Sequence, residues 1–265
     1  MTANPLVKIR LEGVEKRFTS AGGSEQTALS RLDLEIRSGE FVCLVGPSGC
    51  GKTTLINLLA GFEKPSEGSV TIDGRPVAGP DPDHIMIFQD YGLYPWKTVL
   101  GNVLFGLQSR RVPVAEARER ALAALDLVGL RQSAEKHPHE LSGGMKQRVA
   151  IARALAVEPS VLFMDEPFAA LDAFTRLHLQ DELLRIWQEK RPTVVFVTHD
   201  LDEAIALGQR VVLMAPFPGR IQRVLDVSLP YPRERTREDF AVVRRELFNE
   251  FHLVHQQASS SDYAI

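Results

Sequence analysis

The sequence has only two cysteines among its 265 residues, Cys43 and Cys50. Two cysteines cannot build the disulfide framework of a small secreted domain, so we expect a reducing compartment. No apolar run approaches the roughly 18 to 20 residues that a membrane-spanning helix needs. The first residues are also too charged for the apolar core of a signal peptide. We therefore expect a protein that is soluble, or attached to a membrane only peripherally.

An excess of charge of one sign is also missing. Lys and Arg number 31 against 34 Asp and Glu, which gives a net charge of −3. The chain as a whole therefore has no attraction for nucleic acid, and we expect no nucleic-acid partner. The composition, 44% hydrophobic and 25% charged with 19 Gly and 16 Pro, excludes disordered, collagen-like and coiled-coil chains.

Strand and helix patterns alternate along most of the chain, which indicates an α/β fold with a largely parallel sheet. Short continuous apolar runs are typical of buried parallel strands, and they occur at 41–45, 161–164, 194–197 and 211–214. Strand patterns near the N-terminus cover 6–11, 32–36 and 70–72. Helical spacing begins at Lys52, where Gly61 ends the helix, and recurs at 98–107, 114–127, 142–157 and 174–189. The stretch without strands, about 91–158, is expected to be a helical subdomain inserted into the sheet.

The last 30 residues carry the pattern of one more helix. Residues 236–239 form a capping-box pattern. An apolar face of about 20 residues follows, formed by Phe240, Val243, Leu247, Phe251 and Val254. We expect this helix to pack on its own chain; contact with a second subunit or a membrane partner is the alternative. The domain division is then 1–235 and 236–265, with disorder expected from Ala258 onward.

Residues 46–53, GPSGCGKT, fit the phosphate-binding pattern G-x-x-x-x-G-K-[ST]. Glycines let successive backbone N–H groups point at phosphate oxygens, and the following helix adds its positive dipole end. Lys52 would reach the β- and γ-phosphates, and the Thr53 hydroxyl would ligate Mg²⁺. A random chain of this length matches the pattern about once in a hundred, and here a buried strand precedes the match. The predicted nucleotide-binding residues of this loop are Gly46, Pro47, Ser48, Gly49, Cys50, Gly51, Lys52, Thr53 and Thr54.

The two thiols are expected to differ in reactivity. Cys50 lies within the phosphate loop, near a helix N-terminus whose dipole lowers the pKa of a thiol. We therefore expect alkylation of Cys50 and protection of it by ATP. Cys43, inside the buried strand 41–45, is expected to be inert.

Three polar side chains follow buried strands. Asp165 and Glu166 come directly after the run at 161–164, where a carboxylate would lie near the Mg²⁺ of a bound nucleotide. Asp165 is the metal-side group, and Glu166 can polarise an attacking water. The alternative is an acidic pair that caps the next turn. His199 follows the strand at 194–197 and could hydrogen-bond a γ-phosphate, although a lone histidine is usually structural.

Residues 141–148, LSGGMKQR, resemble the signature motif of the ATP-binding-cassette (ABC) ATPases and precede the Asp165 strand as in that family. The resemblance covers about residues 7–229. It implies a P-loop NTPase (RecA-like) parallel-sheet core with an N-terminal antiparallel β subdomain and an inserted helical subdomain. It also implies that ATP and Mg²⁺ bind and that two copies sandwich two ATP molecules head to tail.

The same resemblance implies roles for further residues. Ser142, Gly143 and Gly144 would cap the γ-phosphate bound to the partner's loop, a helix N-terminus being an anion site. Met145 replaces the usual glutamine, so an amide–ribose hydrogen bond is lost while the anion site remains. Four other residues match in order: Gln89 as the Q-loop glutamine that touches Mg²⁺, Asp172 in the D-loop, His199 as the switch histidine, and Phe18 as the aromatic that stacks on adenine. A buried strand residue is the alternative for Phe18. The metal ligands would be Thr53, Gln89 and Asp165.

The segments 89–96 and 166–176 are similar to those of importer ATPases for nitrate, sulfonate, taurine and related small anions. The resemblance implies a homodimeric ATPase subunit on the cytoplasmic face of the cell (inner) membrane. Its partners would be transmembrane permease subunits and, indirectly, an extracytoplasmic solute-binding protein. The apolar residues after Gln89 would receive a permease helix, or simply pack within the helical subdomain. A non-transport ABC ATPase is the alternative function, although its usual coiled-coil insertion or second cassette has no room here. A small-molecule kinase would lack the 141–148 signature.

Overall fold

A computed structural model describes residues 6–20 and 22–262 of the chain. The residues form two compact units. The first unit contains the residues up to Asp81 and from Thr193 on, and the second unit is Pro82–Pro192. The second unit contains the expected helices of 91–158, and it also includes two strands and a further helix.

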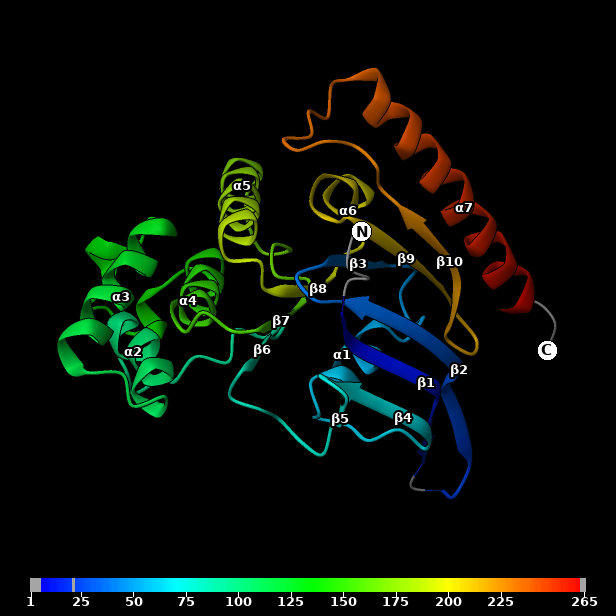
Figure 1. Ribbon diagram of the computed structural model, residues 1–265, viewed down its shortest axis with the longest axis horizontal. Helices are drawn as coiled ribbons and strands as arrows, with labels where there is room; N and C mark the ends of the chain where they lie inside the picture. The colour runs from blue at the N-terminus through cyan, green and yellow to red at the C-terminus, as the bar shows by residue number, and fades with distance from the viewer. Residues whose placement is uncertain (1–5, 21, 263–265) are drawn as a thin grey trace. The chain divides into compact units, whose positions relative to one another are not determined.

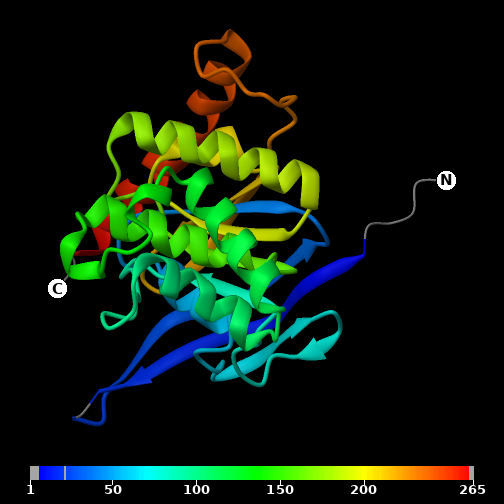
Figure 2. The ribbon, with the colours of Figure 1, turned by 90° about the vertical axis from the view of Figure 1, so that its left-hand side faces the viewer.

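An antiparallel sheet in the first unit has the strand order β2-β1-β4-β5. Figure 2 shows β1 and β2 as a long hairpin, whose length exceeds the strands predicted from the sequence. Gly13, with a φ of 57°, lies where the pairing of β1 with β2 shifts register between Leu11 and Val14. A bulge of this kind interrupts the alternation of polar and apolar residues. The strands are β1 (Val7–Thr19), β2 (Glu25–Arg37), β4 (Glu67–Ile72) and β5 (Arg75–Pro76).

Parallel strands form the core of the first unit (Figure 1). The fully buried strand β3 (Phe41–Val45) pairs in parallel with β8 (Thr193–Val197) and with β9 (Arg210–Ala215). An antiparallel strand, β10 (Arg220–Asp226), continues from β9. Among its described residues, this unit also contains the helices α1 (Lys52–Leu59) and α6 (Leu201–Leu207), besides the C-terminal one. Gly61, with a φ of 80°, ends α1 at the position predicted from the sequence.

The second unit pairs β6 (His84–Ile87) in parallel with β7 (Val161–Asp165). Its longer helices occupy the predicted segments, and α4 packs against α2 and α3. Thr98 begins α2 as a cap, since its Oγ1 accepts a hydrogen bond from the Gly101 N–H at 3.0 Å. The helices are α2 (Val99–Ser109), α3 (Val114–Leu127), α4 (Gly143–Ala156), α5 (Ala173–Lys190), and the short 3₁₀ turns Arg131–Ser133 and Pro138–Glu140.

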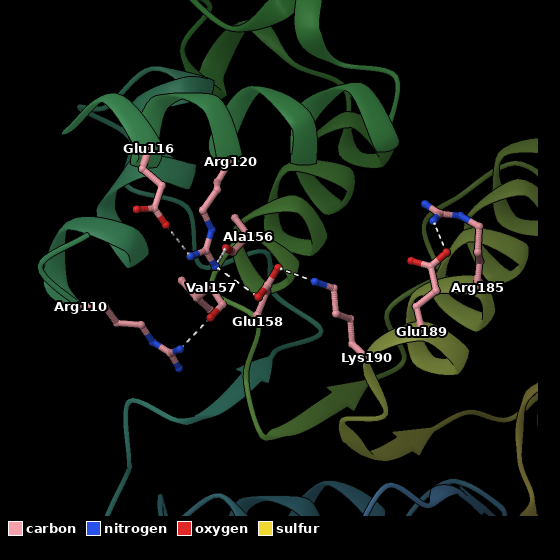
Figure 3. A network of polar contacts seen from close by, with 9 residues as sticks. All are labelled: Arg110, Glu116, Arg120, Ala156, Val157, Glu158, Arg185, Glu189 and Lys190. Carbon is pink, nitrogen blue, oxygen red and sulfur yellow. Dashed lines mark hydrogen bonds and ion pairs between the residues drawn. The ribbon is translucent and has the colours of Figure 1, made fainter. Parts of the chain in front are cut away.

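Two arginines cap the C-terminal end of α4 (Figure 3). Arg120 donates to the Ala156 carbonyl at 2.8 Å, and Arg110 donates to the Val157 carbonyl at 2.6 Å. Glu158 then pairs with Lys190 at the end of α5, at 3.2 Å. Cations at this end of a helix satisfy its unpaired carbonyls and oppose its dipole. The network therefore fixes α4 against the elements around it within this unit.

The C-terminal helix α7 (Glu238–Asp262) packs on α6 and β9 of its own chain, as predicted (Figure 1). Phe240, Leu247 and Val254 are buried, and Arg223 of β10 pairs with Glu246 at 2.9 Å. The helix extends as far as Asp262, and the disorder predicted from Ala258 onward stays a prediction. No Gly or Pro follows Val254 to end the helix, and Ala, Gln and Ser are compatible with it. Residues 263–265 of that predicted tail lie outside the described residues.

A bilayer-spanning helix is not found in the described part of the chain, where each helix is too short or too polar. The division of the chain at residue 235 stays a prediction. The helix α7 belongs to the same compact unit as α6 and β9, on which it packs.

Candidate nucleotide site

The loop between β3 and α1 requires glycine at two of its positions. A Cβ on Gly46 would lie 2.6 Å from both the Met214 carbonyl oxygen and the Cys50 Sγ. A Cβ on Gly51, which has a φ of 89° and precedes α1, would lie 2.4 Å from a methyl group of Leu29. A side chain at either position would clash, so the backbone of this loop can adopt the curled conformation of the motif only with glycine there. Ser48, Gly49 and Thr53 are exposed, while Thr54 is half-buried.

Lys52 folds back over this loop. Its ammonium group donates to the carbonyl oxygens of Gly46 at 2.7 Å and Pro47 at 3.1 Å. The residue is only 8% exposed. Lys52 thus places a positive charge at the loop itself. Because the side chain is nearly buried, water screens this charge little, and it acts strongly on an anion.

The prediction that Cys50 has a lowered thiol pKa and is more reactive than Cys43 is wrong. Cys50 and Cys43 are both fully buried. Burial raises the pKa of the Cys50 thiol, and this effect exceeds the opposing influence of Lys52, whose Nζ lies 3.8 Å from Sγ. Burial also raises the pKa of Cys43 far above its ordinary value. Neither cysteine has the thiolate character or the access that alkylation needs.

The parallel register brings His199 to the same sheet edge as the phosphate loop. Leu44 of β3 lies opposite Val197 of β8, so the two strands end side by side. The backbone N–H of Thr198 continues this contact and donates to the Leu44 carbonyl at 3.1 Å. His199 is the next residue and is exposed. Carboxyl ends of parallel strands are where α/β proteins bind ligands.

Phe18 lies on β1 and is 42% exposed. The ammonium group of Lys16 lies 4.8 Å from the centre of its ring. The alternative that Phe18 is a buried strand residue is therefore wrong. Its stacking on adenine stays a prediction.

The second unit brings its own predicted residues to one edge. Ile87 of β6 lies opposite Met164 of β7, so the two strands end side by side. Asp165 ends β7 and Glu166 follows it, while Gln89 follows β6 at the same edge. Asp165 is buried and Gln89 is exposed. Glu166 has a φ of 46°, a left-handed conformation that is costly for glutamate and is found mainly where the fold enforces it.

Two predicted residues of the second unit are helix caps. The Ser142 hydroxyl accepts from the Met145 N–H at 3.3 Å and begins α4, where Ser142 and Gly143 are exposed and Gly144 is half-buried. Asp172 begins α5, and its carboxylate accepts from the Thr175 N–H at 3.0 Å. That hydrogen bond lowers the pKa of Asp172 below its ordinary value. Both helices thus expose an N-terminus with its positive dipole end.

The model of the ABC transporter family matches residues 29–169 of the chain. That stretch includes the phosphate loop, the signature and the Asp165–Glu166 pair, and it exceeds half of the sequence. The chain is an ABC transporter ATPase. The fold class predicted from the sequence is confirmed, with an antiparallel sheet and a parallel-sheet core.

Several relatives of this ABC ATPase match it over nearly its whole length. An uncharacterized ABC transporter ATP-binding protein of Methanocaldococcus jannaschii is 48% identical over 243 residues, which cover 92% of this chain and 91% of that protein. A nitrate import ATP-binding protein of Synechococcus elongatus is 46% identical over 86% of this chain and 84% of its own length. A solved ATP-binding cassette, a dimer in a post-hydrolysis state with ADP and Pi, matches with a TM-score of 0.77 and 35% identity over 84% of this chain and 100% of that one.

The predicted metal ligands of the ABC ATPase have the chemistry that a magnesium ion prefers, and their binding of one ion stays a prediction. Thr53, Gln89 and Asp165 offer a hydroxyl, an amide and a carboxylate oxygen, the hard donors that Mg²⁺ prefers. Among the residues that the structure describes, no group of three or more His, Cys, Asp and Glu could hold a metal.

Two residues beside His199 were not singled out from the sequence. Thr198 and Glu203 are both buried, and they are joined by a hydrogen bond. A signal was present in Asp200 and Glu203, which have the spacing of a helix cap and its N3 residue. The helix that follows, α6, has only seven residues, which is too short for a periodic apolar pattern to indicate a helix there.

Proposed function

We propose that this ABC ATPase is the ATP-hydrolysing subunit of an importer for a small anion such as nitrate, and that it works as a homodimer. The observation that carries this proposal is the 46% identity to a nitrate import ATP-binding protein, which extends over most of both chains. Sulfonate and taurine belong to the same range of small anions. The solute itself would be selected by the permease and by an extracytoplasmic solute-binding protein.

In this proposal each polar residue has a separate task. The amides of the phosphate loop and the Lys52 ammonium bind the β- and γ-phosphates, with the ring of Phe18 on the adenine. Glu166 orients the attacking water and accepts its proton, while His199 donates a hydrogen bond to the γ-phosphate. Thr53, Gln89 and Asp165 would hold Mg²⁺, which when bound neutralises charge on the phosphates.

The proposed dimer is head to tail, with Ser142, Gly143 and Gly144 of one copy at the γ-phosphate bound by the other copy. Asp172 would lie near the same composite site. The support is that Ser142 and Gly143 are exposed at the N-terminus of α4. An anion held there gains from the helix dipole and from the free N–H groups.

Ser142→Arg should leave ATP binding by the monomer intact and lower hydrolysis by about 100-fold, since one donor of an anion site is lost and bulk is added. Mixing it with the Lys52→Ala protein should restore activity, because one composite site in each mixed dimer then has an intact loop and an intact signature. ATP hydrolysis of each protein alone and of the mixture measures this. Failure of the mixture to exceed both parents, with mixed dimers confirmed by two affinity tags, would contradict the head-to-tail arrangement.

An aromatic surface of the second unit supports a permease partner. Tyr94 packs against Trp96 and Phe105, with ring centres 5.6 Å and 4.6 Å apart. Trp96 remains 73% exposed. Large aromatic residues at a surface commonly anchor a partner helix. We propose that they receive a short permease helix, which would hold the ATPase peripherally at the cytoplasmic face of the inner membrane.

Copurification tests the importer proposal. The chain should copurify with two permease subunits, and the complex should hydrolyse ATP faster with a nitrate-loaded binding protein than with the unloaded one. Trp96→Ala should weaken copurification about tenfold or more, as for an interface hot spot, and keep the basal ATPase rate. The exposed Val114→Ala is the matched control. A complex that never forms would favour the non-transport alternative.

A further inference from the structure

A buried hydrogen bond lies directly beside His199. The hydroxyl of Thr198 donates to Oε2 of Glu203 at 2.6 Å. Thr198 is 2% exposed and Glu203 is 6% exposed. A buried carboxylate costs free energy that only good hydrogen bonds offset, so this pair constrains the local structure.

A second hydrogen bond reaches the same hydroxyl group. The backbone N–H of Asp200 donates to the same Thr198 oxygen at 3.0 Å. A hydroxyl donates one hydrogen bond and can accept others, so Thr198 donates to Glu203 while its oxygen accepts from Asp200. The two neighbours of His199 in the chain are therefore tied to each other through an oxygen that Glu203 orients.

Both sides of this loop are anchored within the first unit. On one side, the Thr198 N–H donates to the carbonyl of Leu44, two residues before the phosphate loop begins. On the other side, the Asp200 carboxylate accepts from the N–H groups of Asp202 at 2.8 Å and Glu203 at 3.2 Å. The carboxylate of Glu203 is thus held by the first turn of α6, at a fixed place relative to the loop.

The far end of α6 is also held. Arg233 donates to the carbonyls of Ile205 and Gly208, the latter at 2.6 Å, and the Tyr231 hydroxyl donates to the carbonyl of Leu207 at 2.7 Å. A helix of seven residues is not stable by itself. These contacts keep α6 in place, and with it the carboxylate of Glu203.

We propose that Glu203 and Thr198 are positioning residues for His199: the Glu203–Thr198–Asp200 chain of hydrogen bonds sets where the imidazole meets the γ-phosphate. The inference rests on the proposed contact of His199 with that phosphate. Neither residue touches the nucleotide; they act through the backbone on either side of His199. Small displacements of a positioned group are costly, which makes such a chain relevant to turnover.

Isosteric substitutions of the full-length protein test this. Thr198→Val and Glu203→Leu remove the hydrogen bond at nearly constant volume, while Thr198→Ser and Glu203→Gln keep a donor and an acceptor. Thr193→Val is the matched control, because Thr193 is equally buried at the start of β8, the strand that Thr198 follows, and its hydroxyl accepts from the Gly39 N–H at 3.0 Å. The measurements are kcat and KM of ATP hydrolysis, ATP affinity and melting temperature.

Thr198→Val and Glu203→Leu should lower kcat by about tenfold to a hundredfold with KM and ATP affinity unchanged. Thr198→Ser and Glu203→Gln should stay near the parent rate, and Thr193→Val should lower the melting temperature without lowering kcat. Equal losses of kcat in Thr193→Val and Thr198→Val would overturn the proposal, since a general loss of stability would then explain both.

A double-mutant cycle with His199→Ala separates this proposal from the function on which it rests. If Thr198 acts through His199, the variant carrying both Thr198→Val and His199→Ala should be no slower than His199→Ala alone. Additive losses would overturn the inference and leave the role of His199 standing. Parent activity in His199→Ala would remove the proposed role of His199 itself, and the inference with it.

Discussion

Lys52→Ala is expected to lower ATP hydrolysis by about 1,000-fold, at the upper end of the effect of removing one preorganised electrostatic contact. The ammonium of Lys52 lies over the phosphate loop at 2.7 Å from the Gly46 carbonyl and is nearly buried. A charge in such a place acts on phosphate with little screening by water. Steady-state hydrolysis and calorimetric ATP binding measure the loss. The exposed Lys64→Ala, in the same unit, should retain full activity.

The substitution also removes a donor from the loop. The carbonyls of Gly46 and Pro47 both accept from Lys52, so the melting temperature of the nucleotide-free protein should fall slightly. A loss of activity with an intact fold would assign the effect to the phosphate contact. Undiminished turnover in a folded Lys52→Ala protein would be incompatible with the assigned phosphate loop.

Glu166→Gln should lower hydrolysis by about 100-fold or more, the range for loss of a general base. The amide keeps the shape and the hydrogen bonding of the side chain but loses the charge that accepts a proton from water. ATP should therefore stay bound, and the two-nucleotide dimer should persist. Size-exclusion chromatography with ATP and Mg²⁺ should show a stable dimer for this variant and a monomer for the parent protein.

A matched control is available for Glu166. Glu158 is another glutamate of the same unit with a left-handed backbone, φ 49° against 46°, and it pairs with Lys190 instead. Glu158→Gln should hydrolyse ATP at the parent rate and form no persistent dimer. If Glu166→Gln turned over ATP as fast as Glu158→Gln does, Glu166 would not be the base.

Strands that are buried on both faces could be predicted from the sequence. The apolar runs found in β3, β7, β8 and β9 are continuous. Their residues are buried, so no polar residue alternates with the apolar ones, as it would in a strand with one face in water. Helix ends with a cap or a stop residue were equally clear, as at Ser142 and Gly61. These signals are local, because the residue itself supplies the hydrogen bond or the backbone conformation.

Elements whose pattern is broken by irregular pairing or by exposure could not be predicted. The bulge near Gly13 interrupts the alternating pattern of β1, so most of this strand could not be predicted. The strand β10 carries Arg220 and Arg223 at a sheet edge, where charged residues are tolerated. The short helix α6 falls below the length at which periodicity is visible. β1 and β10 are held mainly by pairing with the neighbouring strands β2 and β9, and α6 by hydrogen bonds from Tyr231 and Arg233.

The sequence predicts which residues belong to the site and their order along the chain. It does not predict how deeply each side chain is buried. A position in the phosphate loop beside a helix N-terminus indicated a reactive Cys50. The structure closes Gly46 and Met214 around that side chain. Burial is set by elements far away in sequence, so it overrode the local effect of the helix dipole.

The burial of both native thiols has a practical consequence for spectroscopy. Maleimide and methanethiosulfonate reagents need an accessible thiolate, and neither Cys43 nor Cys50 offers one. A cysteine introduced at an exposed site such as Val114 or Val242 would then react with the spin label or fluorophore, while the two native cysteines stay unlabelled. Distances between identical copies could be followed through a catalytic cycle in a protein that keeps its native phosphate loop unaltered.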